Sequence, residues 1–186
     1  MANVYDLQGR EINVFEIHVT QDTFPDPPDW EGWYEIHSFA PAHSNYKSPN
    51  RFGLVMKDGR ITSTDPGIRS KLRAGTAIIL SAYQHGGIVW SLATEGQQCR
   101  FDTAPVAGIM FVRWMRQSKE SRLEMARDFL PSYNAWCNGE TYGIRVYRNG
   151  EAVEYFPTIG GRIEKDLAYI KESWNLPADF PVTRIE

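Results

Sequence analysis

Hydrophobic residues recur at every second position, or in short unbroken runs, over much of the chain, and both patterns are typical of β-strands. Between residues 12 and 19, for example, Phe15, Ile17 and Val19 share one apolar face. The same criteria predict strands at residues 4–7, 33–39, 52–56, 60–64, 76–83, 88–92, 105–114, 141–148 and 151–156.

Short turn signals separate several of these strands. They are Gln8-Gly9, Asp58-Gly59, Gly86-Gly87 and Asn149-Gly150. Tight hairpin turns need residues that adopt positive φ, which glycine does without penalty and asparagine does more readily than most. We therefore expect neighbouring strands to pair as antiparallel hairpins.

Two helices are predicted from their boundaries. Asp65 is a good N-cap, Pro66 suits the first helical position and Gly75 suits the end, so residues 66–74 should be helical. A second helix follows Gly160-Gly161 and covers about residues 162–174.

A longer helix is predicted between them. Residues 121–124 have the Ser-x-x-Glu spacing of a capping box, and apolar residues then recur at intervals of three and four as far as Cys137. Pro131 predicts a kink, because proline gives no N–H and its ring clashes with the preceding turn. Gly139 predicts the end of this helix.

Hairpins combined with two or three helices predict an α+β fold with an antiparallel sheet. The chain has 186 residues, of which 42% are hydrophobic, and this is enough to bury one sizeable core. We expect a single domain over residues 1–186. The alternative is a strand-rich part at 1–115 followed by a helix–hairpin–helix part at 116–186.

Several classes of protein and of site are excluded by the sequence. The longest apolar runs fall well short of the roughly 18 residues of a membrane-spanning helix, and the start lacks the features of a signal peptide. Two cysteines and four scattered histidines do not form a zinc-site pattern, and no phosphate-binding loop occurs. We therefore expect a cytoplasmic protein with no membrane partner, no metal and no cofactor.

Charge is unevenly distributed along the chain, although the net charge is only −3. Residues 1–46 carry eight acidic side chains and one basic one, whereas residues 47–122 carry twelve basic and five acidic. One interpretation is a nucleic-acid-binding module, in which Tyr83 or Trp90 would stack on bases. Its phosphate-binding residues would be Arg60, Arg69, Lys71 and Arg73. The alternative is that the acidic part folds over the basic part.

Candidate catalytic residues are His85, Cys99 and Asp102, which lie in loops expected at one end of a sheet. A Cys–His–Asp arrangement needs an imidazole to deprotonate the thiol and a carboxylate to orient the imidazole. The alternative is structural: His85 in a tight turn, Asp102 bonded to nearby backbone and Cys99 buried as a small hydrophobic residue.

Candidate binding residues lie in an acidic, proline-rich loop. They are the aromatic residues Trp30, Trp33 and Tyr34 and the carboxylates Asp26 and Asp29. Exposed aromatic residues on loops are frequent binding hot spots. Packing of the same rings beneath the loop is the alternative.

Five short blocks carry a resemblance to a known family. They are Tyr83-Gln84-His85-Gly86-Gly87, Cys99-Arg100-Phe101-Asp102, Val106-Ala107-Gly108, Asn138–Gly143 and Asn149–Val153. Over about residues 76–161 the chain resembles a family of small bacteriophage and prophage accessory proteins. Arg100 and Phe101 stand where that family has Pro and Trp, and its later cysteine is replaced by residues 155–158.

The resemblance implies a phage or mobile-element protein that acts in the bacterial cytoplasm. The function we expect is binding of a host protein, as an inhibitor of a bacterial defence system. A small hydrolase or nucleotide-processing enzyme that uses His85, Cys99 and Asp102 is the first alternative, and whether the chain is an enzyme at all stays open. The nucleic-acid-binding module in residues 47–122 is the second alternative.

Overall fold

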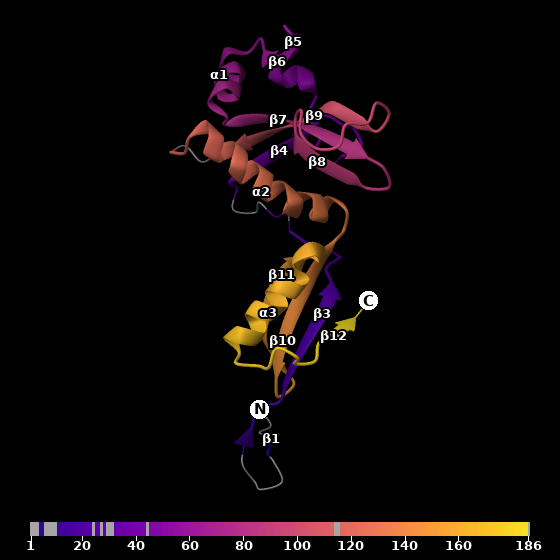
Figure 1. Cartoon of the computed structure of the whole chain (residues 1–186), viewed down its shortest axis with the longest axis vertical. Helices are drawn as coiled ribbons and strands as arrows, with labels where there is room; N and C mark the ends of the chain where they lie inside the picture. Colours follow the sequence, from indigo (N-terminus) through magenta and orange to yellow (C-terminus); the bar gives the residue numbers. More distant parts are fainter. Residues whose placement is uncertain are drawn as a thin grey trace. The chain divides into compact units, whose positions relative to one another are not determined.

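The computed structural model describes residues 4–5, 11–23, 25–26, 28, 32–43, 45–113 and 116–185 (Figure 1). The chain forms two compact units. Residues 26–138 form one, the central unit, and residues 1–25 together with 139–186 form the other, the terminal unit. The terminal unit is therefore built from both ends of the chain.

The central unit is organised around a four-stranded sheet with the order β4 (Tyr34–Ser38), β9 (Thr103–Val112), β7 (Ala77–Gln84) and β8 (Ile88–Leu92). All three strand pairs are antiparallel. Helix α2 (Lys119–Cys137) covers one face of this sheet (Figure 1). The other face is covered by a layer made of η1 (Pro49–Phe52), β5 (Leu54–Lys57), β6 (Arg60–Ser63) and α1 (Pro66–Ala74).

Each face of the central sheet has its own hydrophobic core. On the α2 side, Leu80, Trp90 and Met110 pack with residues of the helix. On the opposite side, Ile79 and Ile109 pack under the layer that contains α1. The sheet is therefore the middle of three layers, and its central strands are buried on both faces.

Helix α1 has the boundaries that the sequence predicts. The Asp65 carboxylate accepts hydrogen bonds from the backbone N–H groups of Gly67 and Ile68, at 2.7 and 3.2 Å. Gly75 ends the helix in the left-handed region, at φ 72°. The α1 prediction is confirmed.

Helix α2 begins three residues earlier than its capping-box spacing predicts. Ser118 is the N-cap, and its hydroxyl accepts a hydrogen bond from the backbone N–H of Ser121 at 3.1 Å. The earlier start adds Lys119, Glu120 and Ser121 to the helix. The guanidinium of Arg122 donates to the Ala74 carbonyl at the C-terminal end of α1, at 2.6 Å. The predicted start at Ser121 is wrong, because a second serine one turn earlier caps the helix.

The terminal unit contains a second four-stranded sheet, with the order β11 (Glu151–Ile159), β10 (Thr141–Arg148), β3 (Phe15–Gln21) and β12 (Thr183–Ile185). Helix α3 (Ile163–Ser173), preceded by η2 (Gly160–Arg162), covers one face. The core of this unit includes Ile17, Ile144 and Leu167. Strands β1 (Val4–Tyr5) and β2 (Glu11–Ile12) form a separate antiparallel pair.

The α+β prediction is confirmed: helices cover mostly antiparallel sheets that are built from hairpins. Strand β12 was not predicted and is parallel to β3. The division between the units lies at residues 25/26 and 138/139, not near residue 115, because α2 packs on the central sheet. That residues 1–186 unfold as one cooperative domain stays a prediction. Among the described residues, no helix is long and apolar enough to cross a membrane.

Candidate functional site

The turn between β7 and β8 lies beside the loop that joins β8 to β9, residues 93–102, and together they gather the three candidate catalytic residues. The Cys99 thiol donates a hydrogen bond to Asp102 Oδ2 at 3.3 Å. His85 Nδ1 lies 3.8 Å from the same carboxylate oxygen. His85, Cys99 and Asp102 therefore converge on one oxygen atom.

The order of contacts differs from that of a Cys–His–Asp triad. In such a triad the imidazole stands between the thiol and the carboxylate and removes the proton from sulfur. Here Asp102 stands in the middle, and no hydrogen bond joins the described side chains of His85 and Cys99. The side chain of His85 is 75% exposed. In this arrangement the carboxylate fixes the thiol and the loop, and the imidazole faces solvent.

Hydrogen bonds from backbone N–H groups tie the end of the 93–102 loop to β7 and β9. The N–H of Cys99 donates to Thr103 Oγ1 at 2.9 Å, and the N–H of Thr103 donates to the Cys99 carbonyl at 3.0 Å. The N–H of Gln84 donates to the Asp102 carbonyl at 2.8 Å, which ties the loop to the end of β7. The tip of the loop is therefore fixed from both sides.

A bidentate ion pair anchors the start of the same loop to α2. Arg127 donates from Nε and Nη2 to the two oxygens of Glu95, at 2.9 and 2.7 Å. The hydrogen bond from Arg127 holds the pKa of Glu95 below its usual value. The Glu95–Arg127 pair is thus formed throughout the neutral pH range.

Phe101 projects from this fixed loop into solvent. Its side chain is 88% exposed, the highest value among the large hydrophobic side chains that the structure describes. Tyr83 at the end of β7 and His85 in the adjoining turn have rings inclined by 24°, with centroids 6.2 Å apart. We call Tyr83, His85, Arg100 and Phe101 the Phe101 surface.

The candidate residues of the acidic loop are divided by the structure. Trp30 and Asp29 lie outside the described residues, and Asp26 is exposed. Trp33 is 40% exposed. Tyr34 stacks on Phe129 of α2 with ring centroids 4.1 Å apart, and its hydroxyl donates to the Met125 carbonyl. Tyr34 therefore contributes to the core of the central unit.

The predicted phosphate-binding residues of α1 have different surroundings. Arg69 donates to the Ser63 carbonyl at 3.4 Å, Lys71 lies over the ring of Phe111 at 5.2 Å, and Arg73 is exposed. Of the two proposed stacking residues, Trp90 is 1% exposed and lies in the core. Trp90 cannot stack on a base unless the central unit opens.

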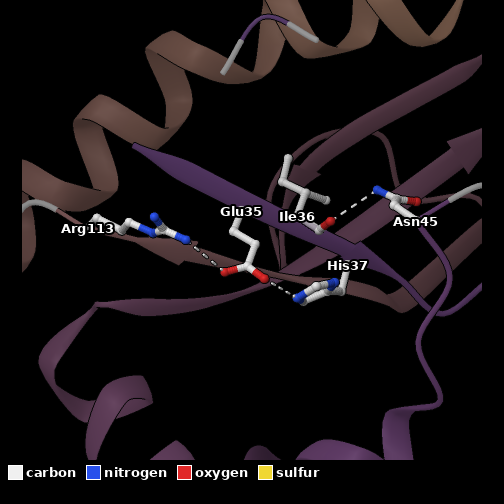
Figure 2. A network of polar contacts seen from close by, with 5 residues as sticks. All are labelled: Glu35, Ile36, His37, Asn45 and Arg113. Carbon is white, nitrogen blue, oxygen red and sulfur yellow. Dashed lines mark hydrogen bonds and ion pairs between the residues drawn. The ribbon is translucent and has the colours of Figure 1, made fainter. Parts of the chain in front are cut away.

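A further polar network, not predicted from the sequence, lies on the edge strand β4 (Figure 2). Glu35 Oε1 lies 2.8 Å from His37 Nε2, and Glu35 Oε2 lies 3.5 Å from Arg113 Nη2. The ring of His37 packs against Phe52, with centroids 5.6 Å apart. The Glu-x-His spacing places both side chains on one face of a strand and is the signal that could have found this pair.

This network holds the layers of the central unit together. His37 packs against Phe52 in the covering layer, and its side chain is mostly buried. On the other side of β4, Asn45 donates to the Ile36 carbonyl at 3.1 Å (Figure 2). These contacts fix the edge strand from both sides, and we assign the network a structural role.

No group of three or more histidine, cysteine, aspartate or glutamate side chains in the described part of the chain is placed to hold a metal ion. Comparisons with models of protein families, with characterised proteins and with solved structures find nothing that matches this chain. A functional argument must therefore come from the residues and their geometry.

Proposed function

We propose that this chain is a phage or mobile-element accessory protein that binds a host protein in the bacterial cytoplasm and thereby inhibits a defence system. The phage context comes from the resemblance of residues 76–161. The 93–102 loop, which carries Phe101, lies within that range. The geometry adds a surface through which such binding would take place.

The observation that carries the proposal is the exposure of Phe101 on a fixed loop. A phenyl ring held in water loses the free energy that burial would give, about 25 cal/mol per Å² of apolar surface. Two anchors, the Glu95–Arg127 pair and the Cys99–Thr103 hydrogen bonds, fix the loop that carries it. A partner then binds without having to order the loop, which lowers the entropic cost of association.

Neighbouring residues give the Phe101 surface the character of a protein-binding patch. Aromatic and arginine side chains are enriched at the centres of protein interfaces, and here Arg100 and Phe101 are adjacent in sequence. The sequence-based expectation placed the contact surface in the acidic loop around Trp30 and Trp33. We propose the Phe101 surface instead, because Tyr34, one of the aromatic candidates of that region, lies in β4 and packs into the core.

The experiment is an affinity purification of the tagged full-length chain from bacterial lysate, with and without nuclease, followed by mass spectrometry. We expect a stoichiometric protein partner that survives nuclease treatment. Phe101→Ala should weaken its binding by roughly 30-fold, the effect of a hot-spot residue worth about 2 kcal/mol. Tyr169→Ala is the matched control, because Tyr169 is also an exposed aromatic residue but lies on α3.

Two outcomes contradict the proposal. One is a lysate that yields no stoichiometric protein partner. The other is a partner that binds Phe101→Ala and the parent chain with equal affinity, because the Phe101 surface then plays no part.

A small hydrolase or nucleotide-processing enzyme is the second candidate function. It is favoured by the convergence of His85, Cys99 and Asp102 on one carboxylate oxygen. The test is His85→Ala assayed against panels of ester, amide and nucleotide substrates. An enzyme loses activity in this variant while its free energy of unfolding is unchanged, since the imidazole faces solvent.

A further inference from the structure

Unpaired positive charge is concentrated in the layer that covers the central sheet opposite α2. Seven of the chain's 20 lysine and arginine residues fall within residues 47–75, against two acidic residues. Asp65 is used as the N-cap of α1, and Asp58 lies in the turn between β5 and β6. No ion pair joins any of the seven basic side chains to a carboxylate of the described residues.

The hairpin of β5 and β6 forms a two-stranded sheet of its own within this layer. Its register places Lys57 directly opposite Arg60, on either side of the Asp58-Gly59 turn. Like charges directly opposite one another destabilise a strand pair. The repulsion between Lys57 and Arg60 therefore lowers the stability of the hairpin, and their pairing is better explained by a binding role.

Exposed apolar side chains lie on both faces of the ribbon: the register places Val55 on the face of Lys57 and Arg60, and Met56 on the face of Ile61. Met56 is 65% exposed and Val55 is 41% exposed, although both belong to β5. The opposite strand contributes Ile61, which packs into the core below and connects the ribbon to the central sheet. The base of the ribbon is thus anchored, while its tip presents methyl groups and positive charge to solvent.

These features match the dimensions and charge of duplex nucleic acid. The major groove of B-form DNA is about 12 Å wide and admits a two-stranded β-ribbon. Phosphate groups line the groove on both sides and bind lysine and arginine side chains without regard to sequence. Exposed apolar side chains can contact thymine methyl groups or enter between base steps.

An acidic protein is another polyanion that could bind this layer. The composition of the layer favours nucleic acid over such a protein. The centres of protein interfaces are depleted of charge and enriched in aromatic side chains. Within residues 47–75 the only aromatic residue is Phe52, and it is buried. Clustered lysine and arginine side chains are the electrostatic footprint of nucleic-acid binding, because they neutralise backbone phosphates.

We propose that the β5–β6 ribbon binds double-stranded DNA, with Lys57 and Arg60 contacting the phosphates that flank a groove. The site shares no residue with the Phe101 surface, so it goes beyond the proposed function and is tested independently. It shares Arg60 with the phosphate-binding residues expected from the sequence, but it adds Lys57 and does not use Arg69, Lys71 and Arg73 of α1.

The test is fluorescence anisotropy of the full-length chain with a labelled 20-base-pair DNA duplex between 50 and 200 mM salt. The slope of log Kobs against log salt is about −0.9 for each phosphate contact. We expect the double variant Lys57→Gln, Arg60→Gln to reduce the magnitude of this slope by about 2 and to weaken binding at 50 mM salt.

A matched control removes the same charge from the terminal unit. Arg148→Gln combined with Lys165→Gln changes two exposed basic residues of β10 and α3 and should leave the slope unchanged. Circular dichroism of both variants shows whether they are folded. Val55→Ala, which keeps every charge and lies on the face of Lys57 and Arg60, should weaken binding without changing the slope.

The proposal is overturned if the parent chain does not bind the duplex at 50 mM salt, or if the control variant loses the same slope as the ribbon variant. A competition experiment distinguishes DNA from an acidic protein as the partner. Poly-glutamate and unlabelled duplex are each added to the labelled complex at matched concentrations of negative charge. If poly-glutamate displaces the labelled duplex at the lower concentration, the DNA proposal is overturned in favour of an acidic protein.

Discussion

The central strands of the two sheets have different burial patterns. In β7 of the central unit, six successive residues from Ala77 to Ala82 are buried. In β10 of the terminal unit, exposed Arg145 lies between buried Ile144 and Val146. Strand β7 has a hydrophobic core on each face, whereas among the described residues β10 has one on the face that α3 covers.

The comparison shows that the pattern of apolar residues along a central strand indicates how many faces of its sheet are covered. Unbroken apolar runs are typical of parallel sheets that helices cover on both faces. Alternating apolar and polar residues are typical of antiparallel sheets with one solvent-exposed face. Here both sheets have antiparallel central strands, so burial and not strand direction decides the pattern.

The largest expected effects come from neighbouring residues on these two strands. Ile79→Ala and Leu80→Ala should each lower the free energy of unfolding by about 2–5 kcal/mol, because the two side chains fill cores on opposite faces of β7. In β10, Ile144→Ala should have a similar effect, whereas Arg145→Ala should change stability by less than about 0.5 kcal/mol.

Urea denaturation of the four variants measures these differences. Near-equal losses for Ile79→Ala and Leu80→Ala, with a large gap between Ile144→Ala and Arg145→Ala, support the comparison. A negligible effect at either Ile79 or Leu80 contradicts it, because one face of the central sheet would then be uncovered.

The outer edges of the two sheets also differ. Strand β8 is an edge strand, and two asparagines, Asn134 of α2 and Asn138 at the C-cap of this helix, pair with its backbone. Asn138 bonds the N–H and carbonyl of Ile88, both at 2.8 Å, and Asn134 bonds those of Trp90, at 2.8 and 3.1 Å. In the part of the chain that the structure describes, no amide side chain pairs with the backbone of β11 in this way. Strand β11 carries Pro157, which removes one backbone donor.

Removing both amides should expose the β8 edge. We expect Asn134→Ala combined with Asn138→Ala to lower the free energy of unfolding by about 1–3 kcal/mol, because backbone groups lose their partners. Amide hydrogen exchange should become faster at Ile88 and Trp90. Asp128→Ala is the control, since Asp128 is an exposed residue of the same helix. Unchanged exchange at Ile88 and Trp90 contradicts the role given to the asparagines.

Much of the fold is predictable from local sequence signals. The bounds of β8 and β10 agree with the predicted ranges, and the strand before Asn149-Gly150 ends where that turn requires. Strand β12 could not be predicted, because it has three residues, no turn signal and a parallel partner 165 residues earlier in the chain, from Thr183 to His18. Long-range pairing of this kind leaves no local pattern.

The candidate site was predictable to a similar degree. The loops that carry His85, Cys99 and Asp102 were expected at one end of a sheet, and the structure brings the three side chains together. The position of Asp102 between the other two depends on loop conformation, which spacing does not determine. The amide pairing of Asn134 and Asn138 was not predicted, since an i, i+4 pair on a helix does not reveal the strand beside it.

Alanine substitutions at two glycines, Gly108 in the central sheet and Gly143 in the terminal sheet, test how well each sheet accommodates an added methyl group. A Cβ on Gly108 of β9 would lie 2.7 Å from the His37 carbonyl oxygen and 3.1 Å from the Trp90 ring. Gly108→Ala should therefore destabilise by about 1–3 kcal/mol, because neither backbone nor buried indole can move. A Cβ on Gly143 of β10 would clash with the far end of the Tyr155 ring, a 48% exposed side chain that can shift more easily than backbone, although the shift strains its hydrogen bond to Asp22.

We expect Gly143→Ala to destabilise less than Gly108→Ala, by below about 1 kcal/mol. Gly161→Ala is the control, because a Cβ there meets no atom within 4 Å. Thermal unfolding of the three variants ranks them. A larger loss at Gly143 than at Gly108 contradicts the distinction between a covered and an open sheet face.

The smallest expected effect is a pH dependence confined to the terminal unit. Partial burial and a hydrogen bond to Asp22, at 3.0 Å, raise the pKa of Tyr155 above its ordinary value near 10. Because the folded-state pKa is the higher one, the stabilisation is complete below the unfolded-state pKa and is lost as pH rises through the folded-state pKa. Tyr155→Phe should therefore flatten the fall in stability above pH 10, and Asp22→Asn should flatten it in part. Absorbance titration of tyrosinate measures the shift directly, and an unchanged titration curve in Asp22→Asn contradicts the role of that carboxylate.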